Sequence, residues 1–208
     1  MICFALAKGR LAEESAALLE KCSIDTSVLK EDTRKLILTS ADGGYRFFLV
    51  KPSDVPTYVE AGVADLGIAG KDTLMEQDKD LYEMLDLKIG ECRLCIAGAP
   101  GRRDALTNPH LRVATKYVNT ARRVFAERDE EAEIIPLNGS IELAPVTGLS
   151  DVIFDIVQSG STLKANGLAV LEEAYGHITA RLVANKVSLK LKAAEILPLV
   201  ARLKEAVS

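Results

Sequence analysis

The chain has 208 residues, of which 48% are hydrophobic, 27% charged and only 5% aromatic, and its formal net charge is −4. This length suits one large domain or two small ones. The composition argues against a general nucleic-acid-binding protein, which would need basic patches and stacking rings. No apolar run is long enough to cross a membrane, and Lys8 and Arg10 follow the first apolar run instead of preceding it as in a secretory signal. We therefore expect a cytoplasmic protein that binds neither nucleic acid nor membranes.

Apolar runs and helical patterns alternate along the first part of the chain. They predict a strand at 2–7, a helix at 11–22, strands at 34–40 and 45–51 around the turn ADGG, a helix at 53–62, a strand at 64–70 and a short helix at 71–77. The same alternation continues to the end of the chain. It predicts strands at 92–100, 112–116, 133–137, 151–157 and 180–186, helices at 117–128, 140–148 (broken near Pro145) and 162–168, and a final amphipathic helix at 188–207 interrupted by Pro198.

This pattern predicts an α/β fold with mostly parallel sheets. About ten strands are more than one small sheet holds, so we expect two sheets in two lobes. The chain would cross into the second lobe near 88–92 and return near 177–181. Residues 1–90 and 179–208 then form lobe I, and residues 91–178 form lobe II.

Cysteine and histidine, which often carry chemistry, give weak patterns here. Cys92 and Cys95 have C-x-x-C spacing, but they lie on a predicted strand and no second metal-spaced pair follows. We interpret them as buried strand cysteines. His110 and His177 each stand apart from the motifs, so we assign neither as a catalytic base.

The segment DIVQSGSTLKANG ends a predicted strand in four small residues, SGST at 159–162, before a helical stretch. In open α/β sheets, ligands bind beyond the carboxyl ends of strands, where a helix start offers free N–H groups. Gly160 would let an anion approach the backbone, and the hydroxyls could donate to it. Asp155 would repel a phosphate in direct contact, but it can accept hydrogen bonds from sugar hydroxyls. The pattern favours a phosphorylated sugar as ligand; the alternative is a plain strand-to-helix turn with a Ser or Thr cap.

The longer stretch ELAPVTGLSDVIFDIVQSGSTL (142–163) resembles the signature of the ATP phosphoribosyltransferase family. The matching positions are Glu142, Gly148, Asp155, Ile156, Ser159, Gly160, Thr162 and Leu163. ALAKGRL (5–11) and PSDVPTYVEAGVADLGIAGKD (52–72) resemble the same family, so the resemblance covers essentially the whole chain. It is similar to the family's short form, which lacks an added regulatory domain.

The resemblance implies a pentosyltransferase that starts histidine biosynthesis. This enzyme transfers phosphoribosyl from 5-phosphoribosyl 1-pyrophosphate to N1 of ATP and releases pyrophosphate. The implied fold has two α/β lobes of the periplasmic-binding-protein (type II) kind around a central cleft, with two chain crossings. The resemblance also implies Mg²⁺ held mainly by substrate rather than by a protein metal site. It further implies a hetero-oligomer with a regulatory subunit similar to histidyl-tRNA synthetase. We also expect the chain itself to form a homodimer core.

The resemblance also assigns roles to individual residues. Those expected to bind the phosphoribosyl donor are Asp155, Ser159, Gly160, Ser161, Thr162 and Leu163. Those expected to act in catalysis are Lys8, Arg10 and Arg34. Candidates on the ATP or pyrophosphate side are Gly9, Lys51, Gly70, Lys71, Asp72 and Glu142. Lys51 stands where arginine is more usual, which keeps the charge but loses the planar fork.

Two other functions remain open on the residues alone. One is a two-lobed small-molecule binding or sensor domain, because fold does not imply function. The other is a phosphoribosyltransferase with a different acceptor, because the small-residue loop would serve that enzyme equally well. Each cation could also be a solvated surface residue.

Overall fold

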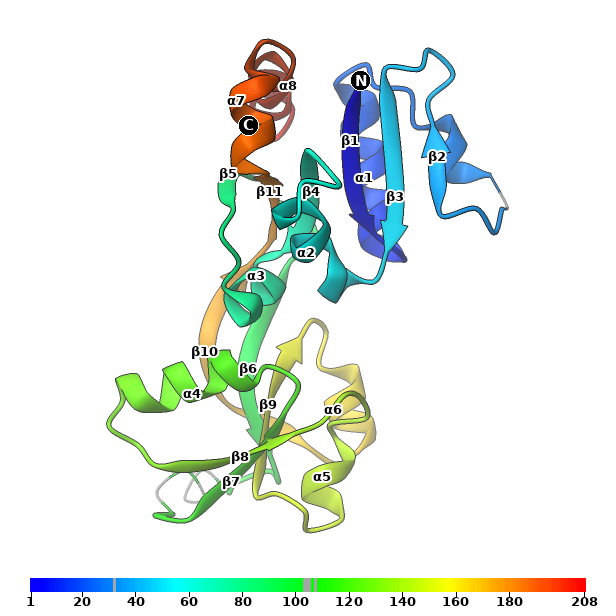
Figure 1. Ribbon diagram of the computed structural model, residues 1–208. Coiled ribbons are helices and arrows are strands. Elements are labelled where there is room, and N and C mark those ends of the chain that lie inside the picture. The colour runs from blue at the N-terminus through cyan, green and yellow to red at the C-terminus, as the bar shows by residue number, and fades with distance from the viewer. Residues whose placement is uncertain (32, 103–105, 107) are drawn as a thin grey trace. The chain divides into compact units, whose positions relative to one another are not determined.

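The computed structural model describes residues 1–31, 33–102, 106 and 108–208, and the chain divides into two compact units (Figure 1). Unit 1 comprises Met1–Gly90 and Thr179–Ser208, and unit 2 comprises Glu91–Ile178. The chain therefore passes from unit 1 to unit 2 and back again. None of the described helices is long and apolar enough to span a membrane.

Unit 1 is built on a six-stranded sheet of order β2-β3-β1-β4-β11-β5. Its strands are β1 (Ile2–Ala7), β2 (Ile37–Thr39), β3 (Tyr45–Val50), β4 (Leu66–Gly70), β5 (Tyr82–Asp86) and β11 (Ala180–Ala184). Its helices are α1 (Arg10–Lys21), α2 (Val55–Glu60), α3 (Lys71–Gln77), α7 (Lys186–Leu191) and α8 (Ala193–Ala206), with 3-10 turns η1 (Ser27–Lys30) and η2 (Pro52–Asp54).

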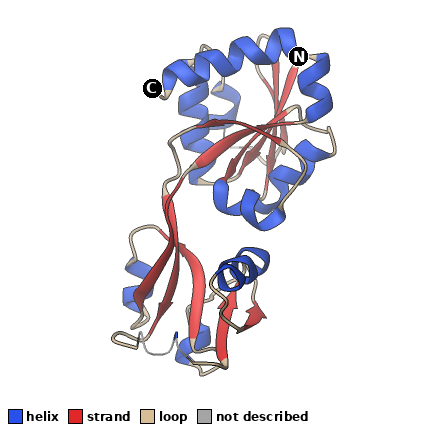
Figure 2. Cartoon of the chain, turned by 90° about the vertical axis from the view of Figure 1, so that its left-hand side faces the viewer, coloured by secondary structure: helices blue, strands red, loops and turns tan. Residues whose placement is uncertain are grey.

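The central strand β1 shows why helices cover both faces of this sheet (Figure 2). Phe4 and Leu6 point into a core shared with α1 and α8, whereas Ala5 and Ala7 point to the other face and pack with the valines of α2. Successive side chains of a strand alternate between faces, so an unbroken apolar run is buried on both. Gly67 on β4 brings α2 close, because a Cβ at this position would lie within 3 Å of the α2 valines.

Unit 2 is built on a five-stranded sheet of order β10-β6-β9-β7-β8. Its strands are β6 (Cys92–Gly98), β7 (Leu111–Thr115), β8 (Ala132–Pro136), β9 (Val152–Val157) and β10 (Ala169–Ile178), and its helices are α4 (Val118–Glu127), α5 (Leu143–Val146) and α6 (Ser161–Ala165). On one face of β9, Ile153 and Val157 pack with Ala144 of α5 and Leu163 of α6. Asp155 lies between these two β9 residues on the same face.

Both sheets are mixed, so the prediction of mostly parallel sheets is wrong. Among the described strands, β1 pairs in parallel with β3 and β4, and β7 with β8 and β9. The remaining ladders, β2–β3, β4–β11, β5–β11, β6–β9 and β6–β10, are antiparallel. The strands β5 and β10 were not predicted. Both are partly exposed and carry acidic residues, so neither forms the apolar run by which a buried strand is recognised.

Pro145 and Pro198, where breaks were predicted, do not end the helices that contain them. Pro145 lies in the single turn of α5, where its missing N–H has no intrahelical partner to lose. Pro198 lies inside α8, and the interruption falls instead at Lys192, between α7 and α8. The ammonium of Lys192 donates to the Asp65 carboxylate at 2.7 Å and to the Met1 carbonyl at 3.2 Å. These partners lie on distant parts of the chain, so the position of the break depends on tertiary contacts.

Candidate functional site

The turn between β9 and α6 carries the predicted phosphate loop. Gly160 occupies the left-handed region, with φ 74°, which glycine adopts without strain. Ser159 Oγ and Ser161 Oγ lie 2.9 Å apart, and the Ser161 backbone N–H donates to Ser159 Oγ at 3.3 Å. Both serines and Thr162 are exposed. The turn therefore presents three hydroxyls to solvent on a backbone that local hydrogen bonds hold in place.

Leu163 differs from the other predicted donor-binding residues. Its side chain is buried and belongs to the core formed with Ile153 and Val157. It therefore anchors the loop to the sheet by packing, and only its main chain can face a ligand.

Asp155 is the largely buried acid of this site, with a side chain only 13% exposed. Its Oδ1 accepts from the Ile156 backbone N–H at 2.8 Å and lies 3.5 Å from the ammonium of Lys116. Burial raises the pKa of Asp155, although Lys116 and the Ile156 N–H pull it down; the negative charge of Glu142 raises it further. A carboxyl that is buried but lightly hydrogen-bonded can gain from a ligand that donates to it.

Lys116 is the residue that the sequence reasoning missed. The parallel pairing of β7 with β9 sets Val113 beside Val152 and Ala114 beside Ile153, so the next positions bring Lys116 beside Asp155. Lys116 is the last residue of the predicted strand 112–116, and Lys8 directly follows the first predicted strand, so both are cations at the carboxyl end of a strand. A search for cations at the carboxyl end of every predicted strand would have found Lys116.

Glu142 was predicted on the ATP or pyrophosphate side. The structure places it in unit 2 at the start of α5, close enough to Asp155 for its charge to raise the pKa of that carboxyl. It therefore belongs to the surroundings of the predicted donor loop.

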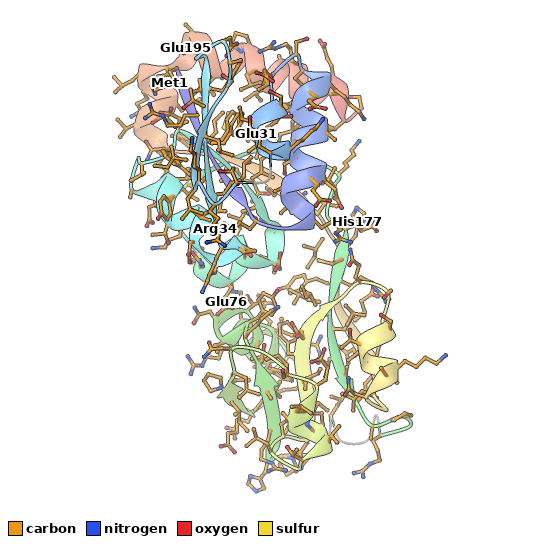
Figure 3. The ribbon with its side chains drawn as sticks, turned by 90° about the vertical axis from the view of Figure 1, so that its right-hand side faces the viewer. Met1, Glu31, Arg34, Glu76, His177 and Glu195 are labelled. Atoms are coloured by element: carbon orange, nitrogen blue, oxygen red, sulfur yellow. The ribbon has the colours of Figure 1, made fainter. Side chains whose placement is uncertain are left out.

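In unit 1, the turn from β1 to α1 carries Lys8, Gly9 and Arg10. Gly9 has φ 92°, and Lys8 N–H donates to the Val50 carbonyl at 2.9 Å. Lys8, Gly9 and Arg34 line one cavity of about 610 Å³, together with three alanines and two glutamates of α1. Arg34 lies at the end of unit 1 where β1 and β3 finish (Figure 3). The structure thus brings Lys8 and Arg34 together.

Arg10 is held differently, because its Nε lies 3.3 Å from Glu14 Oε1, one helical turn on. Its side chain is 57% exposed, so this surface pair leaves the guanidinium accessible to an anion. Lys51 directly follows β3 and is exposed ahead of η2.

The remaining candidates lie at the junction of β4 and α3. The Lys71 ammonium lies 2.6 Å from Glu83 Oε2, and its backbone N–H donates to the Thr179 carbonyl at 3.1 Å. Glu83 also accepts from Arg181 at 2.9 Å. The Asp72 carboxylate folds back against Gly70. Lys71 is therefore part of an ion-pair network that joins α3, β5 and β11.

The two cysteines of the C-x-x-C pair lie on a strand, as predicted. Cys95 is buried on β6, where burial raises the pKa of its thiol, and Cys92 is half-buried on the same strand; both are free. His110 directly precedes β7, whereas Lys116 directly follows it, so the two lie at different ends of this strand. His177 Nδ1 lies 2.9 Å from Glu91 Oε1. Within the described residues, no group of three or more His, Cys, Asp or Glu side chains could hold a metal ion.

Comparison with known proteins identifies the family. A family model described as ATP phosphoribosyltransferase matches residues 51–205. The ATP phosphoribosyltransferase of Caldanaerobacter subterraneus subsp. tengcongensis is 52% identical over 100% of this chain and 98% of its own length. The chain belongs to the ATP phosphoribosyltransferase family. The resemblance drawn from the short motifs is thereby confirmed, and so is the predicted enzyme activity, phosphoribosyl transfer to ATP in histidine biosynthesis.

Solved structures agree with this family assignment. The ATP phosphoribosyl transferase (HisG:HisZ) complex from Thermotoga maritima superposes with a TM-score of 0.84 at 35% identity, covering 100% of this chain and 98% of the other. The periplasmic aliphatic sulphonate binding protein of Escherichia coli has a TM-score of 0.61 at 14% identity, covering 99% and 72%. At that identity the likeness concerns the fold alone. The predicted fold class, α/β lobes of the periplasmic-binding-protein kind, is confirmed.

Proposed function

We propose that unit 2 of this ATP phosphoribosyltransferase binds the phosphoribosyl donor through the β9–α6 turn. One observation carries the proposal: an exposed turn of three hydroxyls follows a buried carboxylate, Asp155, by a few residues. The turn at Ser159, Ser161 and Thr162 donates to the 5-phosphate. Asp155 accepts hydrogen bonds from the ribose hydroxyls. A deprotonated phosphate oxygen has no hydrogen to donate, so the carboxylate suits the ribose and not the phosphate.

In unit 1, Lys8, Arg10 and Arg34 bind the polyphosphate groups of the substrates. During the reaction the bond between ribose C1 and the pyrophosphate oxygen breaks, and a bond from adenine N1 to C1 forms. The departing pyrophosphate takes the electron pair, while the ribose becomes oxocarbenium-like. Cations placed at the leaving group and a carboxylate near the ribose both favour this charge separation. Adenine N1 is already a nucleophile, so the histidines need no role as base.

Mg²⁺ enters this proposal as a companion of the substrate. Magnesium keeps most of its waters and prefers substrate phosphates with one or two carboxylates, so a three-residue protein cage is not required. Bound to the pyrophosphate, it would supply charge neutralisation at the leaving group. We also propose that the enzyme acts in the cytoplasm.

The donor assignment is tested with Thr162→Ala. In this variant we expect the affinity for 5-phosphoribosyl 1-pyrophosphate to fall while the affinity for ATP stays the same. In the wild type, we expect pyrophosphate release to require both substrates. Thr147→Ala is the matched control, because Thr147 is an exposed threonine of unit 2 whose hydroxyl donates to the α5 main chain. Unchanged donor affinity in Thr162→Ala together with Ser159→Ala would reject the donor loop.

We further propose that this chain assembles with a regulatory subunit, since the Thermotoga neighbour is a HisG:HisZ complex. We also propose that the chain forms a homodimer core. Feedback inhibition needs a second ligand site and two coupled states. Because we assign this regulation to the partner subunit, histidine should inhibit the isolated chain weakly and the assembled complex strongly. The measurement is a histidine titration of activity, first for the chain alone and then with the partner. Strong saturable inhibition of the chain alone would contradict this assignment.

A further inference from the structure

Lys116 has no assigned role in the loop motif, yet it is the cation nearest the buried acid of the site. Its ammonium lies 3.5 Å from Asp155 Oδ1, and its side chain is 38% exposed. The same ammonium lies 4.9 Å from the centroid of the Tyr117 ring, and this ring is buried. A cation over an aromatic face is held by the quadrupole of the ring. Lys116 is therefore held between a carboxylate and an aromatic face.

The surroundings of Asp155 make it an unfavourable place for a lone negative charge. Ile153 and Val157 flank it on the same face of β9, and the residue opposite on β6 is Cys95, which is buried. Glu142 at the start of α5 also acts on Asp155, and its effect is repulsive. Burial and a like charge both disfavour the ionised carboxylate.

The contacts of Asp155 also fix its orientation. The Ile156 N–H and the Lys116 ammonium both engage Oδ1. Oδ2 is then the oxygen that can accept from a ligand. An ionised carboxylate only accepts hydrogen bonds, whereas a protonated one must also place a donor hydrogen. A ribose hydroxyl that donates to this carboxyl is therefore bound more strongly when the carboxyl is ionised.

We propose that Lys116 is a positioning residue, which keeps the Asp155 carboxylate charged and oriented through Oδ1 so that Oδ2 accepts a hydrogen bond from a ribose hydroxyl of the donor. This inference rests on the proposed donor site in unit 2. Lys116 acts on the ribose through Asp155 and does not bind the 5-phosphate itself. An opposite charge at this distance lowers a carboxyl pKa and so favours the ionised form of Asp155 against the effect of burial.

The first test is a carbon-13 titration of the side-chain carboxyls in the ligand-free, full-length chain. Asp155→Asn assigns the Asp155 resonance by its disappearance. In Lys116→Met the pKa of Asp155 should rise by about one unit or more, and Lys116→Arg should restore it. Lys190→Met, which removes an exposed lysine of α7, is the control and should leave the resonance unchanged. An unmoved Asp155 titration in Lys116→Met would overturn the proposal.

The second test follows kcat/KM for the donor against pH. Lys116→Met should move the acidic limb of the profile to higher pH by the same shift, with activity approaching the wild-type value above it, and the KM for ATP should not change. In the Asp155→Asn background, Lys116→Met should cause no further loss. An equal loss at every pH, or an additive loss in the double variant, would show that Lys116 contacts the donor directly and would overturn the proposal.

These results separate the inference from the donor assignment. If Thr162→Ala and Ser159→Ala leave donor affinity unchanged, the donor loop fails. The titration of the ligand-free chain still decides whether Lys116 controls the charge of Asp155. If the loop variants lose donor affinity while the Lys116→Met profile matches the wild type, the inference about Lys116 alone fails. Lys116→Gln provides a second neutral variant if Lys116→Met does not fold.

Discussion

Two buried aspartates, one in each unit, have a lysine as neighbour and behave in opposite ways. Asp65 in unit 1 accepts from the Cys3 N–H at 2.8 Å and from the Lys192 ammonium at 2.7 Å. Burial alone would raise the pKa of Asp65, but hydrogen bonds from Lys192, the Cys3 N–H and Ser188 outweigh it and hold the pKa below its usual value. In unit 2, burial prevails, and the pKa of Asp155 is raised.

The difference lies in the number and closeness of the donors. Asp65 joins β4, the start of β1 and the α7–α8 junction, so its hydrogen bonds are satisfied by the fold itself. Asp155 has a lysine at 3.5 Å and one N–H, both on the same oxygen. A satisfied buried carboxylate stabilises a fold, whereas an under-satisfied one beside an exposed turn can gain most from a ligand. We therefore expect Asp65 to stabilise the fold, and this difference supports the proposal that Asp155 binds substrate.

The largest expected effect is on stability, at Asp65. Asp65→Ala should lower the free energy of unfolding by about 3 kcal/mol, because it leaves the Lys192 ammonium and the Cys3 N–H without their acceptor. Chemical denaturation measures this loss, and kcat per folded molecule should not change. Asp80→Ala is the control, since Asp80 is 77% exposed and pairs with Lys186 at the surface. A stability loss at Asp80 as large as that at Asp65 would remove the distinction.

The converse change in unit 2 should affect activity rather than stability. Asp155→Asn should lower kcat/KM for the donor by about 10- to 100-fold, the cost of losing a hydrogen bond to a charged group. It should not lower the free energy of unfolding, because the native state no longer contains a desolvated charge. Steady-state kinetics and denaturation on one preparation give both quantities. A marked loss of stability with normal kinetics would place Asp155 in the same class as Asp65.

The turn beside Asp155 can be altered without touching a polar group. Gly160→Val should weaken donor binding by about 10-fold, since a side chain at positive φ strains the backbone by 1–3 kcal/mol or moves the turn. A clash within the protein is not the cause, because a Cβ at Gly160 would meet Val157 at an ordinary 3.9 Å. Gly43→Val, at φ 68° in the β2–β3 turn, carries a similar strain away from the site. Isothermal titration with the donor should show the loss only in the first variant, and an equal loss in both would count against the loop.

The smallest effect is the pH dependence of stability, and it should have opposite sign at the two aspartates. The pKa of Asp65 is lowered, so its contribution is present above about pH 4, the unfolded value, and is lost as pH falls through the folded pKa. The pKa of Asp155 is raised, so its contribution is fully present below about pH 4 and is lost as pH rises through the folded pKa.

Denaturation curves from pH 3 to 8 compare each variant with the wild type. The deficit of Asp65→Asn should shrink on acidification, and the relative stability of Asp155→Asn should grow as pH rises above about 4. Two differences that run in the same direction would contradict the assignment of the two carboxyls.

Several features of the site could be predicted from short segments alone. The SGST turn needs a glycine at positive φ and hydroxyls next to it, and both conditions are visible in consecutive residues. The Lys8–Gly9–Arg10 turn was recognised in the same way, because cations directly follow an apolar run. The alternation of strands and helices likewise predicted an α/β fold. By contrast, β5 and β10 are partly exposed and contain acidic residues, so their sequences do not identify them as strands. They form strands because they pair with β11 and β6.

The sequence by itself determined which groups are available: a hydroxyl-rich turn, an acid at a strand end and cations after the first strand. Only the tertiary structure decided their partners and their charge. It placed Lys116 beside Asp155 through the register of β7 and β9, buried Leu163 beneath the loop, and paired Lys71 with Glu83. The physical reason is that turn geometry depends on neighbouring residues, whereas burial and ion pairing depend on atoms brought together from distant parts of the chain. The identical chemistry of Asp65 and Asp155 therefore gives opposite pKa shifts, which no local pattern could distinguish.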